Sequence, residues 1–425
     1  MRMDRVRLML LCAAALALAA PGSLAAPAAS PPVSPGGDWP AYRGPGGTGV
    51  SEETGLLKRW PEGGPKVLWK FPLGNGYSGL SIVDDRLYTM FSDSSDEFVL
   101  ALDARTGREI WRARTGKNAP SDQGDGPRST PTVSDGLVFA LGPGAHLHAL
   151  DAGSGAPVWD KDLKREFGSR VPRWGMSTSP LVDGDRLLLD VGGRPGFSIV
   201  ALDRTSGKVR WNSHTDPPGY STPLVVTVGG VRQALFFTGS SLVAVSPADG
   251  RVFWSVPWKT SYDVNAAMPV FVPPDGVFVS SSYDTGAALY RIKPAGEKMT
   301  IDEVWKSRVM KNHFNSSVLY RGDLYGFDDG TLKCIDPKTG DQRWAQRGFA
   351  KGSLLAADGH LIILSEAGLL ALAEATPDEY REKARAQVLE GRTWTMPSLA
   401  GGRLYLRNQK ELVALDLGAG VRAAS

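Results

Sequence analysis

The sequence predicts an all-β fold, an eight-bladed β-propeller of four-stranded sheets that is closed by an N-terminal strand. Two features support this, and each occurs eight times along the 425 residues. One is an apolar strand, a turn and a second strand that carries Trp. The other is a preceding strand of the form Ser-x-Pro-x-Val followed by an Asp-Gly turn. Strands and turns that repeat every 37 to 52 residues are typical of an array of similar sheets.

The first feature keeps a fixed spacing in its five clearest copies. Gly follows the first residue after six positions and Trp after ten in the copies that begin at Ala101, Ala149, Ala201, Ala244 and Cys334. Weaker copies begin at Tyr290, Ala371 and Ala414. We expect Asp to cap the turn and Gly to adopt a positive φ there. The Trp would then offer a large flat surface to a neighbouring sheet.

The two ends of the repeat array complement each other. Residues 65–70 resemble a Trp-bearing strand without its first half, and the last copy, residues 414–418, lacks the Trp strand. A strand from the N-terminal end would therefore finish the C-terminal sheet and leave no open sheet edge. The predicted propeller spans residues 65–418, and residues 419–425 form a C-terminal tail.

The N-terminus has the pattern of a secretory signal peptide, residues 1–26. Three arginines precede the apolar run 8–20, and small residues follow it. A transmembrane anchor is the alternative, but the 13 apolar residues are too few to span a bilayer. We therefore expect export to the periplasm or the medium. Residues 27–37 are predicted to be a disordered linker, and residues 38–64 an extension packed on the propeller by its aromatic side chains.

One segment departs from the strand pattern. Thr376 is a candidate N-cap, Pro377 suits the first helical position, and Glu379 stands three residues after the cap. This predicts a helix over residues 376–389, inserted in the turn of the seventh sheet. The helix would be a docking element or a plain surface insertion.

Composition and motifs exclude several functions. The 48 basic and 45 acidic residues give a net charge of +3, which offers no electrostatic case for binding nucleic acid or an anionic membrane. The sequence contains no Gly-x-Ser-x-Gly, His-Glu-x-x-His or phosphate-binding loop, so hydrolase and nucleotide functions have no support. Without the signal peptide, Cys334 is the only cysteine.

The loops that lead into the innermost strands of a propeller converge on the axis at one face. In this sequence those positions carry Tyr77, Arg128, Trp174, Met176, Tyr220, Asp263, Asn265, His313, Asn315, Lys351 and Trp394. Two cations, several aromatic rings and amides suit a flat anionic ligand, held by stacking and by charge-assisted hydrogen bonds. The alternative is that these side chains fill the channel mouth and satisfy one another.

The repeat Ala-x-Asp-x-x-Thr-Gly-x-x-x-Trp resembles the tryptophan-docking motif of the quinoprotein (PQQ-like) β-propeller superfamily, and the resemblance covers residues 65–418. It implies an eight-bladed propeller in which the Trp of one blade packs against the next. The opening residues 38–45 resemble those of secreted bacterial members. The superfamily includes PQQ-dependent alcohol dehydrogenases and also cofactor-free propellers, such as the scaffold lipoprotein of the outer-membrane barrel-assembly machinery, so the fold does not settle the activity.

In the dehydrogenases PQQ, a planar tricarboxylate, lies near the axis over a Trp, beside Arg or Lys and a calcium ion. The resemblance therefore implies candidate cofactor-binding residues here: Arg128, Trp174, Asn265, Lys351 and Trp394. Asp263 and Asn265 are the candidate calcium ligands.

Three departures argue against that activity. The sequence lacks the adjacent cysteine pair, a Cys-x-x-Cys-His haem motif, and a Glu at an equivalent position. We therefore expect an exported, non-catalytic module that binds a protein or small ligand at its axial face. A PQQ-dependent alcohol or sugar dehydrogenase and a scaffold in outer-membrane protein assembly are the alternatives.

Overall fold

The computed structural model describes residues 37–295 and 298–418. The predicted signal peptide, the linker except for Gly37 and the C-terminal tail lie outside these residues. The helices in the described residues are short: the α-helix α1 (Leu163–Phe167) and the 3-10 helices η1 (Pro45–Gly47) and η2 (Ser261–Asp263). The remaining regular structure is strand, so the predicted all-β class is confirmed.

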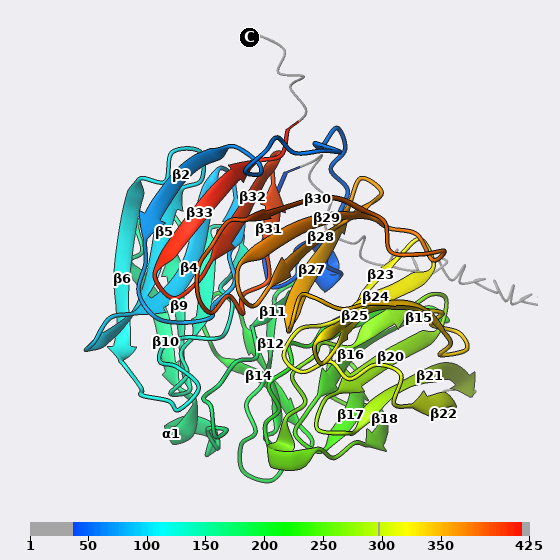
Figure 1. The fold of residues 1–425 in the computed structure, drawn as a ribbon. Helices are drawn as coiled ribbons and strands as arrows, with labels where there is room; N and C mark the ends of the chain where they lie inside the picture. The colour runs from blue at the N-terminus through cyan, green and yellow to red at the C-terminus, as the bar shows by residue number, and fades with distance from the viewer. Residues whose placement is uncertain (1–36, 296–297, 419–425) are drawn as a thin grey trace, which may run out of the picture. The chain divides into compact units, whose positions relative to one another are not determined.

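Eight antiparallel sheets follow one another along the chain as the blades of a propeller (Figure 1). The first sheet contains β3 (Ser81–Val83), β4 (Arg86–Ser92), β5 (Asp96–Asp103) and β6 (Glu109–Lys117). The second contains β7 (Thr132–Ser134), β8 (Leu137–Leu141), β9 (His146–Asp151) and β10 (Pro157–Asp162). The third contains β11 (Leu181–Asp183), β12 (Arg186–Asp190), β13 (Ile199–Asp203) and β14 (Val209–Ser213). The fourth contains β15 (Leu224–Val228), β16 (Val231–Phe237), β17 (Ser241–Val245) and β18 (Val252–Pro257).

The second half of the chain repeats this arrangement. The fifth sheet contains β19 (Val270–Val272), β20 (Gly276–Ser281), β21 (Gly286–Ala295) and β22 (Lys298–Ser307). The sixth contains β23 (Val318–Tyr320), β24 (Asp323–Asp328), β25 (Thr331–Ile335) and β26 (Gln342–Gln346). The seventh contains β27 (Gly352–Ala357), β28 (His360–Ser365), β29 (Leu369–Glu374) and β30 (Glu382–Gln387). The eighth contains β31 (Ser398–Ala400), β32 (Arg403–Arg407), β33 (Glu411–Asp416) and β2 (Val67–Pro72). The first strands of neighbouring sheets contact one another, which identifies them as the inner strands.

The N-terminal strand closes the propeller as predicted. Strand β2 pairs antiparallel with β33, and Trp69 lies opposite Ala414 as Trp111 lies opposite Ala101 in the first sheet. Figure 1 shows the blue β2 beside the red β33. Arg407 of β32 also connects the eighth sheet to the first. Its buried guanidinium donates to the backbone carbonyls of Met90 in β4 and of Gly76 in the loop before β3.

The repeated tryptophans connect each sheet to the next. In six cases the indole N–H donates to a backbone carbonyl of the following sheet, with nitrogen-to-oxygen distances of 2.8–3.1 Å. The pairs are Trp69 with Ala104, Trp111 with Ala152, Trp159 with Arg204, Trp211 with Pro247, Trp305 with Pro337, and Trp344 with Thr376. The repeat glycine allows this contact, because a Cβ on Gly155 would lie 2.5 Å from the Trp111 ring. Apolar residues of adjacent sheets form the core around these contacts.

The predicted helix over residues 376–389 is wrong. Residues Glu382–Gln387 form strand β30, which pairs antiparallel with β29 and completes the seventh sheet. The hydroxyl of Thr376, expected as a helix cap, accepts the backbone N–H of Asp378 within a turn. Arg385 lies opposite Ala371, where the other sheets carry Trp. Without β30 the seventh sheet would lack its fourth strand. Pairing with β29 forms backbone hydrogen bonds and buries Ala386 and the following Leu389, and this outweighs the local preference for a helix.

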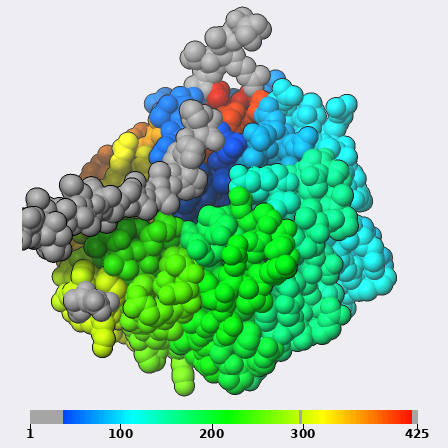
Figure 2. All heavy atoms as spheres, turned by 180° about the vertical axis from the view of Figure 1, so that it is seen from behind, coloured from blue at the N-terminus to red at the C-terminus, as the bar shows by residue number. Residues whose placement is uncertain are grey.

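Residues 38–51, called the axial segment below, lie against the inner strands. Trp39 exchanges backbone hydrogen bonds with Ile82 of β3, and the carbonyl of Pro40 accepts from Val133 of β7. At the end of the segment, β1 (Val50–Ser51) pairs parallel with β27 as a fifth, innermost strand of the seventh sheet. In Figure 2, dark-blue atoms from this part of the chain are visible between the green and cyan regions. The segment therefore occupies the space that the inner strands surround.

Candidate ligand site at the propeller axis

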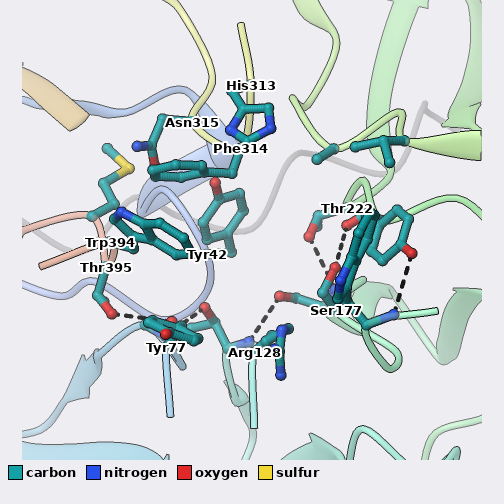
Figure 3. A pocket seen from close by; sticks show the side chains of 18 of the residues that line it. Tyr42, Tyr77, Arg128, Ser177, Thr222, His313, Phe314, Asn315, Trp394 and Thr395 are labelled. Carbon is teal, nitrogen blue, oxygen red and sulfur yellow. Dashed lines mark hydrogen bonds between the residues drawn. The ribbon is translucent and has the colours of Figure 1, made fainter. Parts of the chain in front are cut away.

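A pocket of about 250 Å³ opens where the loops leading into the inner strands converge (Figure 3). Residues from these loops line it: Tyr77, Gly79, Gln123, Arg128, Thr130, Trp174, Ser177, Ser179, Tyr220, Thr222, Val264, Ala266, His313, Phe314, Asn315, Trp394, Thr395 and Met396. Tyr283, from the turn between β20 and β21, lines it as well. Tyr42, from the axial segment, is the remaining lining residue. The predicted convergence of these loops is thus present as a cavity.

Aromatic rings follow one another around the pocket. The ring centroids of Tyr77 and Trp394 are 5.3 Å apart, and the angle between the two ring planes is 31°. For Phe314 and Trp394 the centroid distance is 4.9 Å and the interplanar angle is 37°. On the other side, Trp174 lies 6.0 Å from both Tyr220 and Tyr262. Wall rings of this kind offer flat apolar faces on which a planar ligand could stack.

Both tryptophans turn their polar edges away from the cavity. The indole N–H of Trp394 donates to Glu366 at 2.9 Å, and that of Trp174 donates to Asp122 at 2.8 Å. Neither Glu366 nor Asp122 lines the pocket. These carboxylates hold the rings in place. An arginine guanidinium lies over each ring, Arg392 over Trp394 at 4.4 Å and Arg173 over Trp174 at 5.4 Å, so a ligand could stack only on the part of each ring that lines the pocket.

Arg128 is the positively charged lining residue. It donates to the backbone carbonyls of Gly124 and Gly126 and to the hydroxyl of Ser121, and its guanidinium lies 5.4 Å from the centroid of the Tyr77 ring. Burial lowers the pKa of Arg128 from its usual value, but a guanidinium remains charged in proteins. Among the described residues, no carboxylate forms a salt bridge with it, and no Asp or Glu lines the pocket. The pocket therefore contains a positive charge that no salt bridge within the described residues neutralises, although the carboxylates of Asp122 and Asp125 lie close enough to interact with it electrostatically.

Two further arginines near the pocket are fully buried and are also bonded only to neutral oxygens. Arg407 contacts backbone carbonyls and the Thr89 hydroxyl behind the loop that carries Tyr77, and Arg43 contacts the carbonyls of Gly47, Thr48 and Ser317. Burial lowers the pKa of Arg407 to about 9 and that of Arg43 to about 10. Charges in a low-dielectric interior act over longer distances than charges in water, so both arginines add to the positive potential.

His313 presents a neutral ring to the pocket. Its Nδ1 lies 3.0 Å from the ammonium of Lys351, and its Nε2 lies 3.2 Å from the hydroxyl of Tyr283. Burial, and then the charge of Lys351, lower the pKa of His313 to about 4. Tyr220 also stays protonated, because burial raises its pKa to about 12. Both groups are therefore neutral near pH 7.

The structure brings three of the five candidate site residues together, since Arg128, Trp174 and Trp394 all line the pocket. Lys351 stands behind His313 and contacts the cavity only through that ring. Asn265 is completely buried outside the lining. Its amide donates to the carbonyls of Thr238 and Trp258, and its oxygen accepts from Ser281. The amide of Asn265 therefore holds the fourth and fifth sheets together.

Neither candidate calcium ligand, Asp263 or Asn265, lines the pocket. Asp263 belongs to η2, and the side-chain hydrogen bonds of Asn265 are used within the protein. Within residues 37–295 and 298–418, no group of three or more His, Cys, Asp or Glu side chains is arranged to hold a metal ion. A calcium ion needs several oxygen ligands, and the donors present do not fit one.

Tyr42, Gln123, Tyr283 and Phe314 line the pocket but are not among the residues predicted from the sequence. Phe314 directly follows His313 and precedes the inner strand β23, so its position in the sequence could have identified it. Tyr283 lies in the turn between β20 and β21, which does not lead into an inner strand. Tyr42 comes from the axial segment, far from the other residues in sequence. The aromatic-rich opening at residues 38–45 was the available signal.

Comparison with known proteins places this chain among related propellers. The family model described as outer membrane protein assembly factor BamB matches residues 95–346 and 279–424. BamB of Burkholderia pseudomallei is 26% identical over 321 residues, covering 62% of this chain and 78% of that protein. The solved structure of BamB from Moraxella catarrhalis has a TM-score of 0.59 at 15% identity and covers 83% of this chain and 99% of that chain. The structural likeness supports the eight-bladed fold.

Two relatives of other kinds match over shorter stretches. The serine/threonine-protein kinase AfsK of Streptomyces griseus is 35% identical over 138 residues, which are 32% of this chain and 16% of that protein. The quinoprotein alcohol dehydrogenase PedH of Pseudomonas putida is 23% identical over 158 residues, which are 35% of this chain and 25% of that protein. This chain thus spans a quarter or less of their lengths. No helix within the described ranges is long and apolar enough to cross a membrane.

Proposed function

We propose that this chain, which belongs to the PQQ-like β-propeller repeat family, is a non-catalytic binding module. The family model that matches it is described as outer membrane protein assembly factor BamB. The ligand of this chain is a small, flat anion that enters the axial pocket. The observation that carries this proposal is Arg128, a cation that forms no salt bridge with a described residue and lies in a pocket lined by aromatic rings and by no carboxylate.

Each part of the ligand class follows from a part of the pocket. The rings of Tyr77, Trp394 and Phe314 contact one another in tilted pairs and together offer a surface on which a planar ring could stack. Arg128 favours a carboxylate or a similar oxyanion, because a charge-assisted hydrogen bond contributes about 1.5–3 kcal/mol. His313 and Tyr220 are neutral and can serve as hydrogen-bonding groups for the rest of the molecule.

A matched pair of probes tests this proposal. Naphthalene-2-carboxylate and its neutral isostere naphthalene-2-carboxamide would be titrated into the protein, and tryptophan fluorescence and calorimetry would report binding. We expect the carboxylate to bind at least about tenfold more tightly, which corresponds to about 1.4 kcal/mol. Arg128→Gln should remove this preference and leave the fold intact.

Arg251→Gln is the control for that experiment. Arg251 also lies over an aromatic ring, 5.1 Å from the centroid of Phe253, but it is exposed on the fourth sheet and does not line the pocket. This variant should keep the preference for the carboxylate. Failure of both probes to bind, or equal affinity for acid and amide, would overturn the proposed ligand class.

A quinone-calcium centre does not fit this chain, so we propose no dehydrogenase activity. Neither Asp263 nor Asn265 lines the pocket, the amide of Asn265 is engaged in internal hydrogen bonds, and no carboxylate is among the lining residues. Incubation with PQQ and calcium should therefore give no dye-linked oxidation of alcohols or sugars. Sustained turnover that requires both additions would refute the non-catalytic assignment.

A scaffold in outer-membrane protein assembly is the second candidate. Its support is the match to 78% of the length of BamB of Burkholderia pseudomallei, a protein named as an outer-membrane assembly factor. The exported chain would then retain a stoichiometric protein partner in a pull-down from the periplasm, and Arg128→Gln would not release it. A monomer without a companion would count against this function.

We also propose that the chain is exported, because residues 1–26 have the sequence pattern of a signal peptide. Cell fractionation tests this directly. The full chain should be found in the periplasm or the medium and should lose its first 25 to 28 residues, and a version without residues 1–26 should stay in the cytoplasm. Retention of the full chain in the cytoplasm would contradict export.

A further inference from the structure

The axial segment closes the space inside the propeller below the pocket. Its contacts continue around the inner strands. A Cβ on Gly47 would lie 2.6 Å from Met268 before β19, and one on Gly49 would lie 2.9 Å from Val318 of β23. The carbonyl of Gly49 accepts from Ala356 of β27, and the carboxylate of Glu53, just beyond the segment, accepts from the backbone of the eighth sheet. The segment is thus fixed to sheets on several sides of the axis.

A tight turn raises Tyr42 toward the pocket. The N–H of Gly44 donates to the carbonyl of Ala41, and Arg43 and Gly44 have φ angles of 65° and 70°. Gly44 lies flat on the indole of Trp39, where a Cβ would be 2.5 Å from the ring. Figure 3 shows the Tyr42 ring near those of Phe314 and Trp394. This packing explains the Trp39, Arg43 and Gly44 pattern that the repeat array left unassigned.

Arg43 anchors the same turn. Its guanidinium is fully buried and donates to the carbonyl of Ser317 in the approach to β23 at 2.7 Å, as well as to Gly47 and Thr48 within the segment. The arginine therefore connects the turn that carries Tyr42 to the sixth sheet. Tyr42 is only half buried, and no hydrogen bond of its hydroxyl to another described residue is present. Its ring faces the cavity and is free to contact a ligand.

We propose that Tyr42 is a ligand-contacting residue that sets the depth of the pocket and so limits the length of the anion that fits. This inference rests on the proposed binding function. The propeller repeats provide the walls and the charge of Arg128, whereas the axial segment provides the floor. An anion whose ring system is longer than the pocket meets the Tyr42 ring when its carboxylate reaches Arg128.

Two acids of different length test this inference in the full chain. Naphthalene-2-carboxylate is the short probe, and biphenyl-4-carboxylate is the long one. In the unchanged protein the short acid should bind more tightly. Tyr42→Ala should improve the affinity for the long acid by about tenfold relative to the short one. Tyr42→Trp should act in the opposite direction and weaken binding of the long acid further.

The outcomes separate this inference from the proposed function. If naphthalene-2-carboxylate does not bind to the unchanged protein, the proposed function fails. If it binds but the ratio of the two affinities is the same in Tyr42→Ala, Tyr42→Trp and the unchanged protein, only the role of Tyr42 fails. Tyr320→Ala is the control, because Tyr320 accepts a hydrogen bond from Gly359 away from the pocket and its loss should leave the ratio unchanged. Melting temperatures would verify that each variant is folded.

Discussion

The ammonium group of Lys351 lies 3.0 Å from Nδ1 of His313, and this contact fixes the histidine as a neutral ring in one tautomer. An ammonium group can only donate hydrogen bonds, so Nδ1 must accept and Nε2 must carry the proton. That proton points to the hydroxyl of Tyr283, 3.2 Å away. Lys351 therefore does not line the pocket itself, and the neutral His313 ring lies between its ammonium group and the cavity.

His313 should remain neutral down to about pH 5. Burial and the charge of Lys351 lower the pKa of His313 to about 4 in the folded chain. In the unfolded chain the histidine has its usual pKa of about 6.5, so between about pH 6.5 and 4 the unfolded chain binds a proton that the folded chain does not. The contribution of His313 to stability is therefore present above pH 6.5 and is lost as the pH falls toward 4. Histidine NMR titration measures this pKa. Lys351→Met should raise it, since the like charge is removed and burial remains, and an unchanged pKa would contradict the contact.

Glu97 should make the protein less stable as the pH rises from about 4.5 to 7. Its side chain is 4% exposed, Oε1 has no hydrogen-bond partner among the described residues, and burial raises its pKa to about 7. The unfolded chain ionises first, so the free energy of unfolding falls across this range by an amount on the order of 2–3 kcal/mol. Denaturant unfolding of Glu97→Gln should show a smaller fall than the unchanged protein. The exposed control Glu303→Gln should show the same fall as the unchanged protein. Identical pH profiles for Glu97→Gln and the unchanged protein would refute a raised pKa of Glu97.

Trp159→Ala should destabilise the junction between the second and third sheets by roughly 3–5 kcal/mol. The indole donates to the carbonyl of Arg204, and its ring lies 2.9 Å from the position of a Cβ on Gly207. The substitution therefore removes both a hydrogen bond and a packed surface. Chemical denaturation measures the loss. Val158→Ala, at the neighbouring residue with 49% exposure, should have little effect, and equal effects of the two substitutions would disprove the contact's importance.

Arg407→Met should weaken the closure of the propeller. The guanidinium donates to the carbonyls of Gly74, Gly76 and Met90, and all of these belong to the first sheet or its approach. Methionine fills similar space but leaves buried acceptors unpaired, at about 1–3 kcal/mol each, so the total loss should be at least about 3 kcal/mol. Thermal and denaturant unfolding report it. Arg403→Met, on the same strand but partly exposed, should change stability by less than about 1 kcal/mol.

The repeat array could be predicted because its signals are local. Gly155, for example, must lack a Cβ for Trp111 of the previous sheet to approach, and the same spacing marks other sheets. Strand β2 could be predicted because the eighth sheet lacks a Trp strand and residues 65–70 supply one. Residues 376–389 were assigned wrongly for the opposite reason: Thr376 and Glu379 are good local helix signals, but the seventh sheet needs its fourth strand.

The candidate site divides in the same way. Arg128, Trp174 and Trp394 stand before inner strands in the sequence, and all three line the pocket. Asn265 has a comparable position, yet its side chain turns inward to satisfy two buried carbonyls. Sequence position places a residue on a loop, but the direction of its side chain depends on which buried partners need a hydrogen bond.

By itself, the sequence determined the number of sheets, the closing strand and the loops that meet at the axis, because these depend on spacing within each repeat. Only the tertiary structure decided that residues 38–51 lie against the inner strands and that Tyr42 lines the pocket. The physical reason is that the inner strands leave a space with unpaired backbone groups and apolar side chains, and a segment without a repeat of its own fills it. No local pattern encodes that contact, since its partners lie in sheets spread over the whole chain.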